Sequence, residues 1–230
     1  MFAAIDEARK HLGLDVIDGF LLHAVRNQED FDRRQPALEA LLKAKERGTI
    51  RAVGASSHSV RTIALMARDP RIELLHPIVN QGGFGIQDAS LDELLNVLRE
   101  AKQAGKGVYA MKPLGGGHLR NNVPEALQWL KTRPEVDSFT VGMTSTDEVD
   151  MNVSILCGSP LSPELEKRVT TQSRRLFINE FLCKGCGSCI EACEHKAIHL
   201  AQGKASSDTE HCVLCGYCAP ECPHFAIRII

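Results

Sequence analysis

The sequence predicts an α/β protein, in which helices alternate with the strands of a mostly parallel sheet, followed by a small cysteine-rich domain. Two observations predict this arrangement. Short apolar runs alternate with helical periodicities from residue 1 to about residue 158, and eight of the nine cysteines fall within residues 183–222. Runs that are apolar on both faces and separated by helices are typical of parallel strands buried beneath helices.

The order of the elements follows from these runs. Predicted strands occupy residues 16–22, 50–56, 76–81, 107–112 and 138–143. Predicted helices occupy about residues 2–12, 36–48, 59–68, 88–104, 122–132 and 146–156. Three strands run into polar or glycine-rich sequence, "SSHS", "NQGG" and "KPLGGG". Because loops at the carboxyl ends of parallel strands hold ligands in such folds, we expect a binding site there.

The number of strands leaves the architecture open. Five strands are fewer than the eight of a closed barrel, which typically takes about 250 residues. An open sheet, a decayed barrel and a barrel without its first three strands all agree with the pattern.

Composition excludes several classes of protein. Lysine and arginine (27) nearly balance aspartate and glutamate (29), and no basic block indicates nucleic-acid binding. No apolar run approaches the roughly 18 residues of a membrane span, and the first residues lack the pattern of a secretory signal. We therefore expect a cytoplasmic protein with reduced or metal-bound thiols.

The cysteines form an internal repeat. "CKGCGSCIEAC" and "CVLCGYCAPECP" share the spacing C-x2-C-x2-C-x3-C at an offset of 29 residues. Three closely spaced cysteines can reach different irons of one cubane, while the fourth is carried on to the other cluster. We therefore assign two [4Fe–4S] clusters. The first is ligated by Cys183, Cys186, Cys189 and Cys222, and the second by Cys212, Cys215, Cys218 and Cys193.

Two zinc knuckles are the alternative, because C-x2-C pairs also bind zinc. A zinc site, however, does not require that the fourth cysteine of each motif ligate the metal of the other motif. The segment resembles the bacterial two-cluster ferredoxins over about 50 residues. It departs from them at Glu194, which stands where a proline often follows the fourth cysteine.

The first part of the chain is similar to the aldo/keto reductase family. The resemblance rests on five motifs in the same order, "LGLDVIDGFLLH", "KERGTIRAVGASSHS", "IVNQ", "MKPLGGG" and "TVGMTSTDEVDMN". It implies an incomplete (β/α)8 TIM-barrel-like domain of about five β/α units, with a nicotinamide cofactor, NAD(H) or NADP(H), at its carboxyl face.

The resemblance also implies site residues. His23 matches the family's active-site histidine, which orients or polarises a substrate carbonyl. The matched cofactor-binding positions are Ser56, Ser57, Gln81, Met111, Lys112, Leu114, Gly142, Met143, Thr144 and Asn152. Ser57 replaces the family's usual asparagine, and Met111 replaces an aromatic residue that stacks on the nicotinamide ring. Glu148 stands where a basic residue often meets a 2′-phosphate, which disfavours NADP in its usual binding mode.

The family's acid tyrosine, with its lysine and aspartate partners, belongs to the first three strand units, for which this sequence has no matching residues. We therefore expect a companion chain, a homo-oligomer or a longer gene product to complete the barrel. An unpaired, apolar outer edge of the strand at 16–22 would favour such association.

These features lead to two functional hypotheses. The first is an iron–sulfur oxidoreductase in which a partial barrel (1–158) and a two-cluster ferredoxin domain (176–230) flank a linker helix (159–175). Electrons would pass between the clusters, a redox partner protein and a nicotinamide or carbonyl/alcohol site. The second is a non-catalytic electron-transfer or docking subunit with a degenerate barrel.

Overall fold

A computed structural model describes residues 1–171 and 175–229. The chain divides into two compact units. The first comprises residues 1–115 and 121–143, and the second comprises residues 116–120 and 144–230. The predicted linker at 159–175 includes residues 172–174, which lie outside the described part. Each unit is described by itself below.

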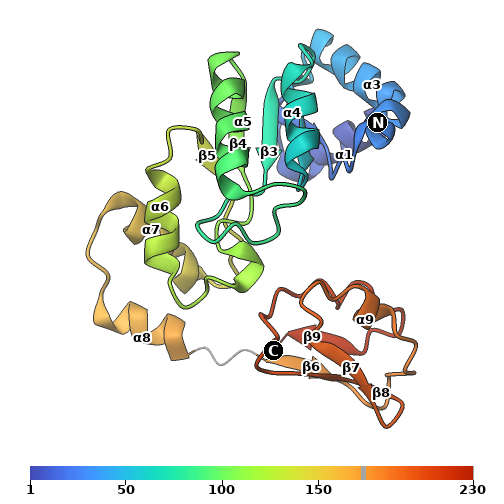
Figure 1. Cartoon of the computed structure of the whole chain (residues 1–230), viewed down its shortest axis with the longest axis vertical. Coiled ribbons are helices and arrows are strands. Elements are labelled where there is room, and N and C mark those ends of the chain that lie inside the picture. The colour runs from blue at the N-terminus through green and yellow to red at the C-terminus, as the bar shows by residue number, and fades with distance from the viewer. Residues whose placement is uncertain (172–174, 230) are drawn as a thin grey trace. The chain divides into compact units, whose positions relative to one another are not determined.

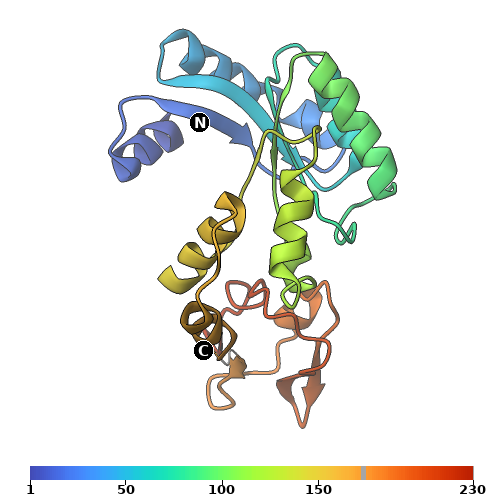
Figure 2. The same ribbon diagram turned by 90° about the vertical axis from the view of Figure 1, so that its left-hand side faces the viewer.

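A five-stranded parallel sheet forms the centre of the first unit (Figure 1). The strands follow one another in sequence order, and Figure 2 shows β1 running beside β2. They are β1 (Ile17–Leu22), β2 (Ile50–Ser57), β3 (Leu74–Pro77), β4 (Gly107–Ala110) and β5 (Ser138–Phe139). Sequential parallel pairing with helical crossovers is the arrangement of half a barrel, and it confirms the predicted class.

Helices connect the strands of this unit. They are α1 (Phe2–Leu12), α2 (Gln28–Arg33), α3 (Gln35–Glu46), α4 (Val60–Arg68), α5 (Leu91–Gln103) and α6 (Val123–Lys131), with a short 3-10 turn η1 (Gly115–Gly117). Side chains define their starts. Ser59 accepts from the Thr62 amide at the start of α4, and Ser90 forms a capping box with Glu93 at the start of α5.

One face of the sheet packs against the helices and forms the core. Val53 of β2 and Leu75 of β3 are fully buried there, together with Leu38 of α3, Met66 of α4 and Leu98 of α5. Figure 1 shows α4 and α5 beside β3 and β4. Burial of side chains of this size contributes about 1.5–3 kcal/mol each and accounts for most of the driving force.

On the other face of the sheet, a leucine lies against glycines of three neighbouring strands. A Cβ atom at Gly19, Gly54 or Gly107 would lie 2.7–2.8 Å from the side chain of Leu74. The absence of side chains at these three positions therefore lets Leu74 cover the strands around it. Residues two positions further along each strand lie on the same face, nearer the carboxyl ends.

The second unit contains two helices and a cysteine-rich segment. The helices are α7 (Thr146–Cys157) and α8 (Pro163–Thr171), and the cysteine-rich segment contains β6 (Leu176–Ile178), α9 (Ser188–Glu191), β7 (Ile198–Ala201), β8 (Lys204–Ser207) and β9 (Ile227–Ile229). Strand β6 pairs antiparallel with β9, and β7 pairs antiparallel with β8. These small antiparallel sheets agree with the predicted α+β domain.

Three predicted elements were wrong in extent or missed. The strand predicted at 76–81 is β3 at Leu74–Pro77, because Pro77 has no amide proton to extend the ladder. The strand predicted at 138–143 pairs only at Ser138–Phe139. Helix α2 was not predicted, because its sequence, QEDFDR, is too short and too polar to show a period.

Among the described residues, no helix is both long enough and apolar enough to cross a membrane.

Substituting Gly54 by alanine should destabilise the first unit. The new Cβ atom would lie 2.7 Å from the Leu74 carbonyl oxygen, which belongs to the sheet backbone and cannot move aside cheaply. We expect a loss of about 1–3 kcal/mol, as in other overpacked sites. Urea unfolding measures it. Gly142→Ala is the matched control, because nothing lies within 4 Å of that Cβ position, and equal midpoints for the two variants would contradict the assigned packing.

Candidate functional site

His23 lies directly after β1, at the carboxyl end of the sheet. The chain turns sharply at Ala24, which has a left-handed φ of 51°. The hydroxyl of Ser56, at the end of β2, stabilises this turn by accepting a hydrogen bond of 2.7 Å from the Ala24 amide. The same hydroxyl lies 3.2 Å from Nδ1 of His23. The imidazole is therefore held by the neighbouring strand, while the residue as a whole is exposed.

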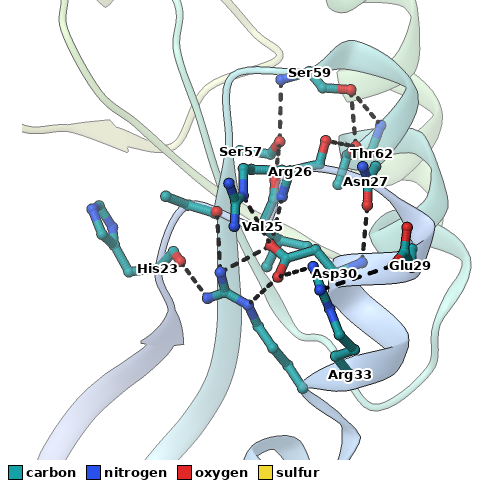
Figure 3. A network of polar contacts seen from close by, with 12 residues as sticks. His23, Val25, Arg26, Asn27, Glu29, Asp30, Arg33, Ser57, Ser59 and Thr62 are labelled. Atoms are coloured by element: carbon teal, nitrogen blue, oxygen red, sulfur yellow. Dashed lines mark hydrogen bonds and ion pairs between the residues drawn. The ribbon is translucent and has the colours of Figure 1, made fainter. Parts of the chain in front are cut away.

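A buried carboxylate holds the backbone of His23 from the other side (Figure 3). Asp30 accepts two hydrogen bonds from the Arg34 guanidinium, at 2.9 and 3.1 Å, and one from the Arg26 amide at 3.0 Å. Arg34 in turn donates to the carbonyl oxygen of His23 at 2.7 Å. Figure 3 shows the imidazole of His23 pointing away from this network while its carbonyl oxygen points into it.

The charge of Asp30 is stabilised by this arrangement. The hydrogen bond from Arg34 is the main cause that holds the pKa of this carboxyl below its usual value, and the Arg26 amide adds to it. Charge-assisted bidentate pairs of this kind are strong and geometrically specific. The network therefore fixes where the backbone places the His23 side chain.

Ser57 belongs to the same turn. Its hydroxyl donates to the Val25 carbonyl at 2.6 Å and accepts from the Ser59 amide at 3.1 Å. Ser57 is 1% exposed, and Ser56 is fully buried. Both predicted cofactor-binding serines thus use their hydroxyls to hold the turn that carries His23.

His76 of β3 is a side chain that the sequence interpretation missed. Its ring stacks on Tyr109 of β4, with ring centroids 4.7 Å apart and an interplanar angle of 23°. Its Nδ1 donates to the Tyr109 carbonyl oxygen. Burial is the main cause that lowers its pKa, and the charge of His23 lowers it further. The register of β2 and β3, which pairs Ser56 with His76, is the signal that would have placed it near His23.

The remaining predicted cofactor-binding residues of the first unit lie along strand ends and loops. Met111 is 8% exposed, and its segment forms an isolated bridge with Ile78. Lys112 has a left-handed φ of 53°, and Gln81 is exposed. Leu114 is partly buried, whereas Gly142 and Met143 are exposed.

The predicted adenosine-binding residues of the second unit surround the start of α7. The Glu148 carboxylate accepts a hydrogen bond of 2.6 Å from the Thr144 amide. Asn152 is 5% exposed, and its Oδ1 has no hydrogen-bond partner among the described residues. A buried acceptor of this kind fits a ligand that brings an N–H group. The Glu148 carboxylate places a negative charge at the start of the same helix.

Four cysteines of the cysteine-rich segment line one cavity of about 310 Å³, open mouth included: Cys183, Cys186, Cys189 and Cys222. Burial raises the pKa of Cys189, and the neighbouring Cys183, Cys222 and Cys186 thiols raise it further. Hydrogen bonds from Ser188 lower the pKa of Cys186. The structure thus brings Cys222 to the first three cysteines, although 33 positions separate it from Cys189.

The other four cysteines also interact with one another. Burial raises the pKa of Cys218 to about 11, and Cys215, Cys193 and Cys212 contribute to the rise. Cys193 therefore lies with the second motif, not with its own. Both groups show the crossing that the spacing predicts for a pair of cubane clusters.

Backbone amides already point at these sulfurs. The Ala197 amide donates to Cys193 Sγ and the Ala226 amide to Cys222 Sγ, each at 3.3 Å and at positions related by the repeat. Amide donors stabilise thiolate charge, so the donor set fits iron–sulfur clusters. In the described part of the chain, no three histidine, cysteine or carboxylate side chains are placed to hold a single metal ion.

The comparisons with known proteins agree with this geometry. Residues 1–126 match the model of the aldo/keto reductase family, and residues 182–226 match the model of the 4Fe-4S dicluster domain. A search of curated protein sequences finds no match.

Solved structures show the same fold. The apo form of aldo-keto reductase AKR11C1 from Bacillus halodurans is 21% identical with a TM-score of 0.53, and 73% of this chain and 66% of that chain are covered. A Pseudomonas aeruginosa protein assigned to the aldo-keto reductases is 21% identical with a TM-score of 0.54, over 67% of this chain and 56% of that one. MGS-M4, an aldo-keto reductase from a Medee basin deep-sea metagenome library, is 18% identical with a TM-score of 0.50, over 74% and 64%.

This chain therefore spans between 56% and 66% of the length of these structures. The predicted class, an incomplete (β/α)8-barrel-like domain followed by a two-cluster ferredoxin-like domain, is confirmed. The individual site residues and the exact domain borders stay predictions.

Arg34→Met should destabilise the chain more than Arg33→Met. Arg34 anchors Asp30 and the His23 carbonyl, whereas Arg33 is 62% exposed and lies 3.7 Å or more from its acidic partners. Thermal unfolding at pH 7 measures the difference as a lower midpoint for Arg34→Met.

The effect should depend on pH in a defined direction. The pKa of Asp30 is lowered from 3.8, so the stabilisation it gains is present above that value and is lost as the pH falls through the lowered pKa. The gap between wild type and Arg34→Met should therefore shrink in acid. A gap that stays constant down to about pH 2 would show that Arg34 acts through packing alone.

Proposed function

This chain belongs to the aldo/keto reductase family and carries a 4Fe-4S dicluster domain, and from that premise we propose that its two clusters exchange electrons with a redox site at the carboxyl end of the barrel strands. The two matched domains make the chain an iron–sulfur oxidoreductase. The observation that carries the proposal is the crossed grouping of the eight cysteines, with Cys222 among the first set and Cys193 among the second.

Electron counting supports this pairing of domains. Reduction of a carbonyl to an alcohol takes two electrons and two protons, and the reverse reaction releases them. A [4Fe–4S] cluster supplies one electron at a time. Two clusters in one chain therefore match one carbonyl/alcohol conversion or one hydride equivalent, with a redox partner protein as the source or acceptor of the electrons.

His23 is the residue of this chain that we assign to the reacting carbonyl. It stands at the end of a parallel strand with its imidazole directed away from the structural network, so it can donate a hydrogen bond to a carbonyl oxygen. The family's tyrosine acid and its lysine and aspartate partners have no counterparts among these residues. We propose that a companion chain, a second copy or a further segment brings them to the edge at β1.

We also propose that the chain binds a nicotinamide cofactor. In the first unit, Gln81 and Met111 match the positions that meet the nicotinamide end of the cofactor. In the second unit, taken by itself, Asn152 matches a position that meets the adenosine end. The unpartnered Oδ1 of Asn152 supports this assignment. The Glu148 carboxylate on the Thr144 amide supports NAD(H) over NADP(H), because a 2′-phosphate would meet a negative charge.

One observation favours the alternative of a non-catalytic electron-transfer or docking subunit. The Ser56 and Ser57 hydroxyls are engaged in the turn after β1, so neither is free to hold a carboxamide without a change in the turn. In this alternative the clusters are the active part and the sheet is a docking surface. Iron analysis tests the clusters that both hypotheses share, and nucleotide binding separates the two hypotheses.

Anaerobically purified protein should contain about eight irons per chain, four for each cluster. Cys222→Ser and Cys193→Ser should each lose about one cluster's worth of iron, because each removes a ligand from a different group. Cys157→Ser is the control, since Cys157 ends α7 and is exposed, and it should keep the full iron content. About two zinc ions and no iron in the wild type would contradict the cluster assignment.

NADH should bind the full chain, and its fluorescence should change on titration. Glu148→Arg should raise the affinity for NADPH relative to NADH by about tenfold, because a charge reversal at this position replaces repulsion by attraction. Asp150→Arg is the matched control, since it makes the same charge change on an exposed position of the same helix. If folded, iron-loaded protein binds neither nucleotide, the electron-transfer subunit is the remaining hypothesis.

A further inference from the structure

A row of polar side chains crosses the sheet at its carboxyl end, on the face opposite the helices. Ser56 pairs with His76 across β2 and β3, and the His76 ring stacks on Tyr109 of β4. On the other side, Ser56 contacts His23. Ser56, His76 and Tyr109 lie two positions after Gly54, Leu74 and Gly107, which pair with one another across β2, β3 and β4. His23 lies two positions after Leu21, which pairs with Gly54, so all four belong to the same layer of the same face.

The contact with Tyr109 determines the tautomer of His76. A carbonyl oxygen accepts hydrogen bonds only, so Nδ1 of His76 must carry a proton to bind the Tyr109 carbonyl. The lowered pKa of His76 keeps the ring neutral near pH 7. In a neutral ring with a proton on Nδ1, Nε2 is an acceptor, and it has no partner among the described residues.

His23 takes the opposite tautomer. Ser56 is fully buried and its hydroxyl oxygen already accepts from the Ala24 amide. The hydroxyl proton has one acceptor within reach in the described part of the chain, Nδ1 of His23 at 3.2 Å, and a buried donor left unused is costly. Nδ1 therefore accepts, and the proton of the neutral ring is on Nε2, which faces outward as a donor.

The two imidazoles thus offer complementary groups on the two sides of Ser56, from the end of β1 and from β3. We propose that His76 is a substrate-binding residue whose Nε2 accepts a hydrogen bond from a substrate hydroxyl next to the carbonyl that His23 binds. This inference rests on the proposed function of His23 and deepens it. The site would take hydroxycarbonyl compounds, or the corresponding diols, in preference to carbonyl compounds without the neighbouring hydroxyl.

Tyr109 supports the assignment in two ways. Its carbonyl holds the His76 proton on Nδ1, and its stacked ring fixes the plane of the imidazole. Its phenol oxygen has no partner among the described residues, and the side chain is partly buried in the same layer. The rigid support means that little side-chain entropy is lost when His76 binds a hydroxyl.

The first test reads the tautomers directly. Long-range ¹H–¹⁵N correlation spectra of the ¹⁵N-histidine-labelled full chain, near pH 8, distinguish protonated from bare ring nitrogens. We expect a proton on Nδ1 of His76 and on Nε2 of His23, with His76→Asn and His23→Asn used for assignment. A proton on Nε2 of His76 would overturn the proposal, and this result needs neither clusters nor cofactor.

The second test uses hydroxyacetone and acetone, which differ by one hydroxyl group. Both should shift the His23 resonances, because both contain a carbonyl. Hydroxyacetone alone should also shift the bare Nε2 of His76. A His76 resonance that hydroxyacetone leaves unmoved, or that acetone moves equally, overturns the proposal.

Variants separate binding from structure. His76→Asn keeps an N–H near the Tyr109 carbonyl but has no atom in place of Nε2. It should weaken hydroxyacetone binding, followed at His23, by about three- to tenfold and leave acetone binding unchanged. His11→Asn, an exposed position on α1, is the control and should change neither. If NADH binding and cluster loading fail while these shifts appear, the proposed redox function falls and the hydroxyl site stands.

Discussion

The parallel register of the first four strands is the constraint on which the candidate site depends. It pairs Ser56 with His76 and leaves His23 one step beyond the Leu22–Ala55 pair. A slip of one residue in any strand would turn its side chains to the other face. The fit of Leu74 against its glycine neighbours opposes such a slip, because Leu74 cannot lie over a residue with a larger side chain. The packing of Leu74 against its glycines therefore determines which side chains meet in the next layer, where Ser56 pairs with His76.

The turn after β1 needs support on its outer side, because β1 is an edge strand in the described residues. In the described residues β1 has a strand neighbour on one side only, so the turn after it lacks support from the other side. The Asp30–Arg34 pair supplies that support from α2 and from the residue that follows it, through the carbonyl of His23. Ser56 acts from the paired side through the Ala24 amide. The turn that carries His23 is thus held from both sides.

The sequence was most informative for the cysteines, because their spacing alone predicts which of them ligate the same cluster. The 29-residue repeat was enough to predict the crossed cysteine groups, because cluster geometry restricts which thiols can meet. His76 could not be found in this way, since its role follows from the strand register and from a carbonyl 33 positions away. Helix α2 was missed for a related reason, because its stability comes from Asn27 and Arg34 contacts with Asp30 and not from an apolar period.

The cysteine-rich segment lacks the large core of the first unit, and this links its folding to its metal content. Its sheets have two strands each, which is marginal for stability in water. Its buried cluster of side chains includes Cys183, Cys189, Cys218 and Cys222 with only a few aliphatic residues. Burial raises the pKa of Cys189 and Cys218, and neighbouring thiols raise it further, so binding of iron to these two sulfurs would release protons. Cluster binding would therefore complete this core, which would couple iron loading to the folding of the segment.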